Sequence, residues 1–148
     1  MAQTGSRSDP YAAFNFIVSI ENVAVAGFSE CTGLSNESAI IEYRNGNEVA
    51  TNHKLPGLIK YADCELKRGF TDSLDLWKWR KAVLDGTTSR KDGSITLLNE
   101  ARQPVLTWNF IAAWPSKWDG PALGAGKNEV AIEGLRISHE GMTMEKAT

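Results

Sequence analysis

One stretch of the chain, residues 71–86 (TDSLDLWKWRKAVLDG), has a strong helical pattern, whereas the segments around it alternate with a period of two. Thr71 or Asp72 can cap the first turn by accepting a backbone N–H, and Gly86 can end the helix in the left-handed conformation. At 100° per residue the large apolar side chains share one broad arc, and Arg80 falls inside that arc. We therefore predict one amphipathic helix that packs on a sheet. The apolar arc consists of Leu76, Trp77, Trp79, Val83 and Leu84.

The size and charge of the chain fit one soluble domain. It has 148 residues, 42% of them hydrophobic and 23% charged, and a net charge of −2. This charge gives no strong field toward nucleic acid or an anionic membrane, and no apolar run approaches the ~20 residues of a membrane helix. The first residues lack the basic start and apolar middle of a signal peptide, so we expect synthesis in the cytoplasm. Cys31 and Cys64 lie in no metal or redox spacing and are expected to be reduced thiols.

The remaining segments read as short strands separated by turns. Residues 1–10 have the composition of a flexible arm, so the expected domain covers residues 11–148. Within it, the pattern predicts a mainly β fold: a small antiparallel β-barrel or sandwich of about seven strands with the one helix packed outside. In the last strand the apolar phase changes around Glu133 and Gly134, which predicts a bulge. The expected strands cover residues 14–20, 23–30, 38–44, 62–68, 94–98, 105–113 and 130–138.

A polar excursion, residues 45–57 (NGNEVATNHKLPG), follows the third expected strand. It is longer than a tight hairpin turn requires, and loops of this length are usually functional or disordered. We therefore expect this segment to carry a specific role.

The residues that could support catalysis do not form a recognisable pattern. His53 and His139 are not spaced with a second metal ligand, and the charged row Asp63, Glu65 and Lys67 shows no apolar pocket that would raise a carboxyl pKa. The glycine-rich GPALGAG at 120–126 lacks the Lys-Ser/Thr ending of a P-loop, and no Gly-x-Ser-x-Gly occurs. We predict no enzyme activity, no cofactor and no metal.

Exposed sheet edges offer a different kind of function. A chain of short strands must protect its edges, and closing a ring of subunits removes them as well as closing one chain does. Alternate charged residues would then line a water-filled lumen, or else form an ordinary solvated face. The candidate lumen residues are Glu42, Arg44, Asp63, Glu65 and Lys67.

A series of short motifs runs in order from residue 9 to about residue 142. They are DPY and FNF (9–16), GFSE (27–30), TGL (32–34), IEYR (41–44), KLPG (54–57), LKRG (66–69), LWKWR (76–80), LDG (84–86), WNF (108–110), AWPSKW (113–118), EVAIE (129–133) and HEG (139–141). This series resembles that of the tail tube proteins of contractile phage tails and the inner tube proteins of extracellular contractile injection systems. That family is related in fold to the type VI secretion tube protein.

The resemblance implies a structural role and a set of partners. It implies a β-barrel with one helix, six copies per ring, and rings stacked into a hollow tube inside a contractile sheath. The partners it implies are further copies of the chain, the sheath protein, baseplate or spike and cap proteins, and a cargo effector or DNA in the lumen. Assembly would take place in a phage tail or in an injection particle that can be released from the cell.

The resemblance also assigns roles to two surfaces. The long loop would reach the adjacent ring, and the charged side of the helix would face the sheath. A monomeric β-barrel that binds a small apolar ligand remains the alternative. The ring-stacking residues would be Asn45, Gly46, Asn47, Glu48, His53, Lys54, Leu55 and Pro56, and the sheath-facing residues Asp75, Lys78, Lys81 and Asp85.

Overall fold

The computed structural model describes residues 10–12, 15–21, 24–44, 46, 53–126 and 128–147. The predicted arm, residues 1–10, lies outside this part of the chain except for Pro10. The elements are β1 (Phe16–Ile20), β2 (Ala24–Ala26), β3 (Glu30–Thr32), β4 (Asn36–Tyr43), β5 (His53–Tyr61), β6 (Cys64–Gly69), α1 (Asp75–Leu84), β7 (Lys91–Leu98), β8 (Pro104–Asp119), β9 (Ile132–Ser138) and β10 (Gly141–Lys146).

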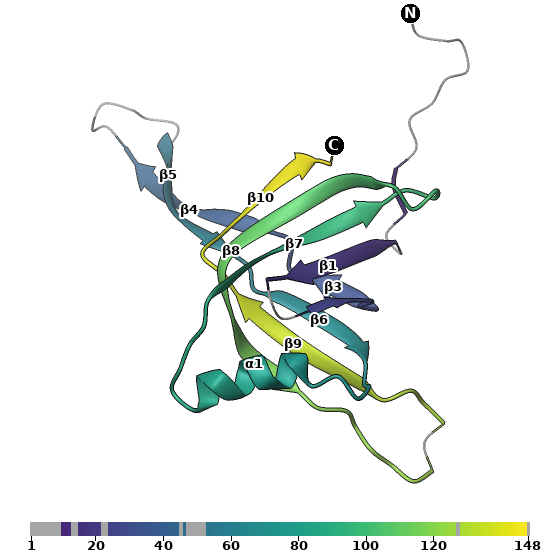
Figure 1. Cartoon of the computed structure of the whole chain (residues 1–148). Coiled ribbons are helices and arrows are strands. Elements are labelled where there is room, and N and C mark those ends of the chain that lie inside the picture. The colour runs from purple at the N-terminus through teal and green to yellow at the C-terminus, as the bar shows by residue number, and fades with distance from the viewer. Residues whose placement is uncertain are drawn as a thin grey trace, which may run out of the picture.

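Most strands belong to one antiparallel sheet that folds over itself (Figure 1). Its order is β2-β1-β7-β8-β9-β6-β3, with β10 paired to β8. The first half of β8 pairs with β7 and β10, and its last residues pair with β9, so this strand belongs to both layers. Among the described residues, the end strands β2 and β3 do not pair with each other. The predicted sandwich is therefore confirmed, in an open form rather than as a closed barrel.

The core lies between the two layers. Alternation along each strand decides which side chains enter it: Val18 and Ile20 of β1 and Ile95 of β7 face Leu66 of β6 and Leu135 of β9. Helix α1 adds Leu76 and Trp79 from below (Figure 1). The inward rows of β1, β6 and β8 include the core residues Val18, Ile20, Cys64, Leu66 and Phe110.

Strand β8 changes layers at a bulge. Lys91 pairs with Ala113 and Gly93 pairs with Phe110, so the register shifts by one residue between them. Ala112 takes a positive φ of 52°, and its N–H donates to Oδ1 of Asp92 at 3.0 Å. Such a bulge bends a strand, which lets β8 leave one layer and join the other. The predicted end of this strand at residue 113 is thus wrong.

The helix is shorter than the predicted range 71–86, and it begins at a later residue. It begins at Asp75 with Leu74 as the N-cap and has no side-chain cap, so the predicted capping by Thr71 or Asp72 is wrong. Thr71 instead accepts the N–H of Ser73 in the preceding turn. The predicted end is confirmed, because Gly86 has a φ of +93° and donates to the carbonyl of Val83.

The apolar arc of the helix packs against the second half of β8. The rings of Trp77 and Trp118 lie 4.9 Å apart, and Arg80 Nη1 donates to the carbonyl of Pro115 at 3.0 Å. Leu84 is 58% exposed, so its predicted place in the packed arc is wrong. It lies in the last turn of the helix, where burial has already given way to the exposed residues 84–88.

Three strands and the inward phase of β9 were not predicted. The expected strand 23–30 is wrong as one strand, because it divides into β2 and a separate β3. Strand β5 begins within the expected loop, at His53, and among the described residues it pairs only with β4. Strand β10 covers the outer edge of β8. Strand β9 has no bulge at Glu133 and Gly134; it pairs in regular register with β6 from Ile132 to Ile137, and the irregularity lies in β8 between Pro115 and Lys117. The apparent phase change arises because Glu133 occupies a core position.

Candidate assembly surfaces

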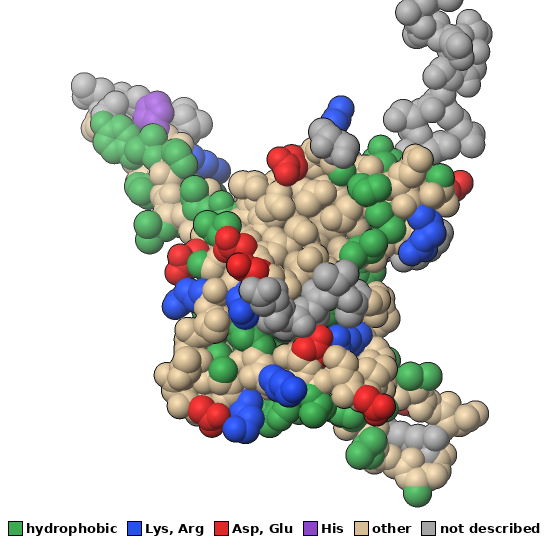
Figure 2. Space-filling model, in the orientation of Figure 1, with side chains coloured by type: hydrophobic (Ala, Val, Ile, Leu, Met, Phe, Trp, Pro, Cys, Tyr) green, Lys and Arg blue, Asp and Glu red, His purple; other side chains and the backbone are tan. Residues whose placement is uncertain are grey.

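The β4–β5 hairpin projects from the body of the molecule (Figures 1 and 2). It carries exposed apolar side chains on both faces. Directly opposed residues share a face, so the pair Ile41 and Leu55 lies on one side and the pair Ile40 and Pro56 lies on the other. Ile40 is 65% exposed and Leu58 is 86% exposed. A two-stranded ribbon is only marginally stable in water by itself, and exposed apolar patches mark interaction sites. The hairpin is therefore the strongest candidate interface.

The predicted ring-stacking residues fall into three groups. His53, Lys54, Leu55 and Pro56 lie in strand β5 and not in a loop, which corrects the expected loop boundary. Gly46 lies in a turn beyond the end of β4. Asn45, Asn47 and Glu48 lie outside the described residues.

The predicted lumen residues do not form one surface. Glu42 and Arg44 belong to the hairpin, whereas Asp63, Glu65 and Lys67 lie on or beside the exposed side of β6. The reason is that β4 leaves the main sheet and, within the described part of the chain, pairs only with β5, so its outward row does not continue that of β6.

Ion pairs to the neighbouring strands line the exposed side of β6. Glu65 Oε1 accepts from Arg136 Nη2 at 2.9 Å, and Lys67 Nζ lies 3.7 Å from Glu30 Oε2. Each pair joins directly opposed residues of neighbouring strands. Glu30 and Arg136 were not predicted as part of this surface, because their positions opposite Lys67 and Glu65 depend on strand register.

The charged side of α1 is divided between solvent and the interior. Lys78, Lys81 and Asp85 are exposed, and Lys81 Nζ lies 3.0 Å from Asp85 Oδ2. Asp75, predicted on the exposed side, instead turns toward β6 and accepts a hydrogen bond from Arg68 Nη2 at 2.7 Å. The sequence pattern missed this because a helical wheel gives the direction of a side chain and not its partner.

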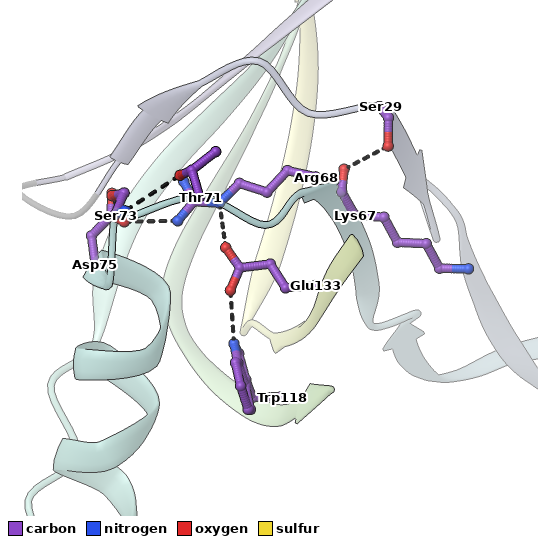
Figure 3. Close-up of polar contacts among 8 residues, drawn as sticks. All are labelled: Ser29, Lys67, Arg68, Thr71, Ser73, Asp75, Trp118 and Glu133. Atoms are coloured by element: carbon purple, nitrogen blue, oxygen red, sulfur yellow. Dashed lines mark hydrogen bonds and ion pairs between the residues drawn. The ribbon is translucent and has the colours of Figure 1, made fainter. Parts of the chain in front are cut away.

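A buried polar network ties the start of the helix to the sheet (Figure 3). Arg68 Nε donates to Glu133 Oε1 at 2.6 Å, and Trp118 Nε1 donates to Glu133 Oε2 at 3.2 Å. Arg68 also lies over the ring of Phe28, with its guanidinium carbon 5.7 Å from the ring centre. One guanidinium thus contacts the two strands β6 and β9, the helix and the loop before β3.

The environment of this network favours its charged state. Burial acts to raise the pKa of the Asp75 carboxyl, but hydrogen bonds from Arg68 and Ser73 outweigh it and hold the pKa below its ordinary value. Burial likewise acts to lower the pKa of Arg68, and the hydrogen bonds to Asp75 and Glu133 raise it above its ordinary value. Arg68 and Glu133 continue the buried rows of β6 and β9. Two opposite charges at matching positions of these rows are the sequence signal that could have predicted the pair.

The described residues contain no cluster of three or more His, Cys, Asp or Glu side chains that could hold a metal. His53 lies near Tyr43 on the hairpin, and His139 lies between the rings of Tyr61 and Phe110. Cys31 and Cys64 are free thiols; burial raises the pKa of Cys31 to about 11, and burial together with Cys31 and Asp63 raises that of Cys64 to about 12. Such thiols are poor nucleophiles at neutral pH.

An open apolar recess lies between β1 and β3. Its volume is about 420 Å³, and its walls include Phe16, Leu34, Leu97 and Trp108.

No helix in the described part of the chain is long and apolar enough to cross a membrane.

Solved structures from contractile injection systems resemble this chain over nearly its full length. A chain of the PVC sheath–tube complex in the extended state matches with a TM-score of 0.83 and 27% identity, covering 93% of each chain. For the baseplate of the anti-feeding prophage the values are 0.84 and 29%, covering 94% of this chain and 97% of that one. For the cap that terminates the anti-feeding prophage tube they are 0.86 and 26%, covering 99% and 100%.

A more distant match extends the likeness in fold. A type six secretion system protein has a TM-score of 0.61 and 10% identity and covers 89% of this chain and 83% of its own, which shows a shared fold alone. This confirms the expected relation in fold. The curated proteins contain no match to the sequence.

A family model settles the relationship that these structures indicate. The model described as "T4-like virus tail tube protein gp19" matches residues 12–143, which include every described strand from β1 to β9 and most of the chain. The resemblance carried by the ordered motifs is thereby confirmed: this chain belongs to the T4-like virus tail tube protein gp19 family.

Proposed function

We propose that the protein is the structural subunit of the inner tube of a contractile injection machine or phage tail. Six copies form a ring, and the rings stack into a hollow tube through which cargo or DNA passes when the sheath contracts. The observation that carries the proposal is the projecting β4–β5 hairpin, which exposes apolar side chains on both faces and pairs with no other strand of the described chain. Membership of the tail tube family supports it.

The hairpin is the proposed contact between rings. Strand β5 has nine residues, so the hairpin reaches about 30 Å at the usual rise of a strand. Burying its apolar side chains against a neighbour removes them from water, which is the main favourable term in association. The stacking residues proposed for this contact are the described Gly46, His53, Lys54, Leu55 and Pro56, with Asn45, Asn47 and Glu48 at the tip.

Ring closure is assigned to the edges of the sheet. Strands β2 and β3 end the path of the main sheet, and β10 pairs on one side only with β8 among the described residues. Unpaired strand edges are templates for pairing with another chain. A closed ring of copies would satisfy these backbone groups without a partner of another kind.

The lumen is assigned to the exposed side of β6. Asp63, Glu65 and Lys67 lie there, beside Arg136 of β9 and Glu30 of β3. Glu42 and Arg44 belong to the hairpin and are therefore assigned to the contact between rings and not to the lumen. The ion pairs across this side leave little net charge, which suits a surface past which a charged cargo must slide without sticking.

The remaining exposed side of the helix is assigned to the sheath. Lys78, Lys81 and Asp85 offer weak, salt-screened contacts that can be released when the sheath shortens. The relatives whose structures come from a sheath–tube complex, a baseplate and a tube-terminating cap support sheath, baseplate and cap proteins as partners. The assembled particle, a phage tail or an injection system, is then the place where the protein acts.

The molar mass of the purified protein tests this proposal. We expect size-exclusion chromatography with light scattering to give six-copy rings or larger stacks, and negative-stain microscopy to show rings and tubes. A persistent monomer at high concentration that binds a small apolar ligand in the recess beside Phe16 and Trp108 would refute the tube proposal and favour the ligand-binding alternative.

A further inference from the structure

A second exposed apolar projection lies at the end of the molecule opposite the hairpin. The connection between β8 and β9, residues 120–131, extends from the lower right of the body in Figure 1, whereas the hairpin extends from the upper left. Within this connection Leu123 is 83% exposed and Val130 is 79% exposed. Figure 2 shows hydrophobic side chains on both projections. The molecule therefore has two apolar ends that point in different directions.

Two residues at the base of this connection enlarge its apolar surface. Phe70 donates its N–H to the carbonyl of Ala131 at 2.9 Å, which fixes the turn after β6 beside the end of the connection. Gly69 pairs with Ile132, and both Phe70 and Ile132 are exposed. We call Phe70, Leu123, Val130 and Ile132 the distal patch.

We infer that the distal patch is the docking surface for the β4–β5 hairpin of a second copy in the adjacent ring. This inference rests on the proposed stacking of rings. Stacking in one direction is a heterologous contact, because it joins one end of a subunit to the opposite end of the next. The hairpin and the distal patch lie at opposite ends and are both exposed and apolar, which is the arrangement that such a contact requires.

The charges of the hairpin support an apolar receptor. Glu42 lies directly opposite Lys54, and Glu37 lies directly opposite Lys60, so each of these four charges has a neighbour of opposite sign within the hairpin. These four charges therefore need no charged residue from a partner. The four residues of the distal patch provide none, and they match the apolar side chains Ile40, Leu58 and Ile59 in character.

Cross-linking between two variants that each carry one introduced cysteine tests the contact. Protein carrying Leu58→Cys is mixed with protein carrying Val130→Cys, assembled and oxidised, while the native thiols Cys31 and Cys64 stay unreactive because burial raises their pKa. The matched control replaces Val130→Cys with Lys78→Cys on the exposed side of the helix. We expect at least about tenfold more disulfide-linked dimer from the Leu58–Val130 mixture than from the control.

Two results of the cross-linking experiment would overturn the inference and leave the proposed function standing. Assembled tubes could give equal cross-linking in the two mixtures, or the Val130→Cys protein could link to itself more than to the hairpin. In either case the rings stack through another contact. Wild-type protein that forms no rings would instead refute the proposed function itself.

Charge substitutions in the distal patch give a second, independent measurement. In a Leu123→Asp/Val130→Asp variant both changes are at exposed positions, so we expect six-copy rings but a loss of stacking of about tenfold or more. Leu84→Asp, at an exposed leucine of the helix, is the matched control and should leave stacking unchanged. Tubes of wild-type length from the distal variant would be the third overturning outcome.

Discussion

At the scale of single residues, Glu133 and its partner Arg68 form the buried ion pair that the apolar pattern of the sequence did not predict. Both side chains are buried, at 2% and 5% exposure, and each continues a row of apolar residues. Sequence alternation alone counts a charged residue as outward, so it assigned Glu133 to a bulge. The pairing of β6 with β9 reveals instead that Arg68 lies directly opposite Glu133.

Removing one member of this pair should be more costly than removing both. Glu133→Leu leaves Arg68 buried with Asp75 as its remaining carboxylate, and we expect a loss of about 3–5 kcal/mol in the free energy of unfolding. Arg68→Met in the Glu133→Leu background should recover part of that loss, since the buried cation is gone although Asp75 loses its partner. Urea unfolding of the two variants and the wild type measures the difference.

Glu65→Leu is the matched control, because Glu65 forms its ion pair with Arg136 on an exposed surface. Its effect should stay within about 1 kcal/mol. A Glu133→Leu variant as stable as the Glu65→Leu variant would contradict the structural role of the buried pair.

Asp75 gives the network a defined pH dependence. Its pKa in the folded protein is lowered from the ordinary 3.8, so it stabilises the fold above that value and loses this contribution as the pH falls through the lowered pKa. We expect Asp75→Asn to be less stable than wild type at pH 7 and the two proteins to converge as the pH falls through the lowered pKa of Asp75. Urea midpoints measured across this range would contradict the assignment if their difference stayed constant.

At the scale of elements, the predicted parts of the fold are those whose residues face a common core. Strands β1, β6 and β7 and the body of α1 alternate or repeat against the interior, so their apolar patterns are visible in the sequence. Strand β5 was missed because neither of its faces meets a core, and β10 because most of its residues are exposed. The second half of β8 was missed because its direction changes at a bulge that depends on Asp92.

A glycine in β7 shows how closely the neighbouring strands β1 and β8 pack around it. A Cβ at Gly93 would lie 2.4 Å from the Phe110 ring and 2.7 Å from the carbonyl oxygen of Ser19. We therefore expect Gly93→Ala to lower the free energy of unfolding by about 1–3 kcal/mol, since the ring or the strand must move. Thermal unfolding should show a much smaller effect for Gly69→Ala, where a Cβ meets nothing within 4 Å. Equal effects would contradict this packing.

At the scale of the whole molecule, the sequence motifs predicted the family and the general role, and the structure changed the location of the surfaces. The expected stacking loop became a projecting hairpin, and the expected lumen row divided between that hairpin and β6. Neither change could be predicted from alternation, because both depend on β4 leaving the main sheet. The distal patch depends on which ends of the fold lie opposite each other, which only the arrangement of strands in space reveals (Figure 1).

The central claim is that the apolar hairpin holds rings together in a tube. Electron microscopy and mass measurement of the wild type beside an Ile40→Lys/Leu58→Asp variant test it most directly, because both substituted positions are exposed and contribute little to the fold. We predict tubes from the wild type, single six-copy rings from this variant, and tubes from the Leu84→Asp control. Tubes of normal length from the hairpin variant, or a wild-type protein that stays monomeric at high concentration, would contradict the account.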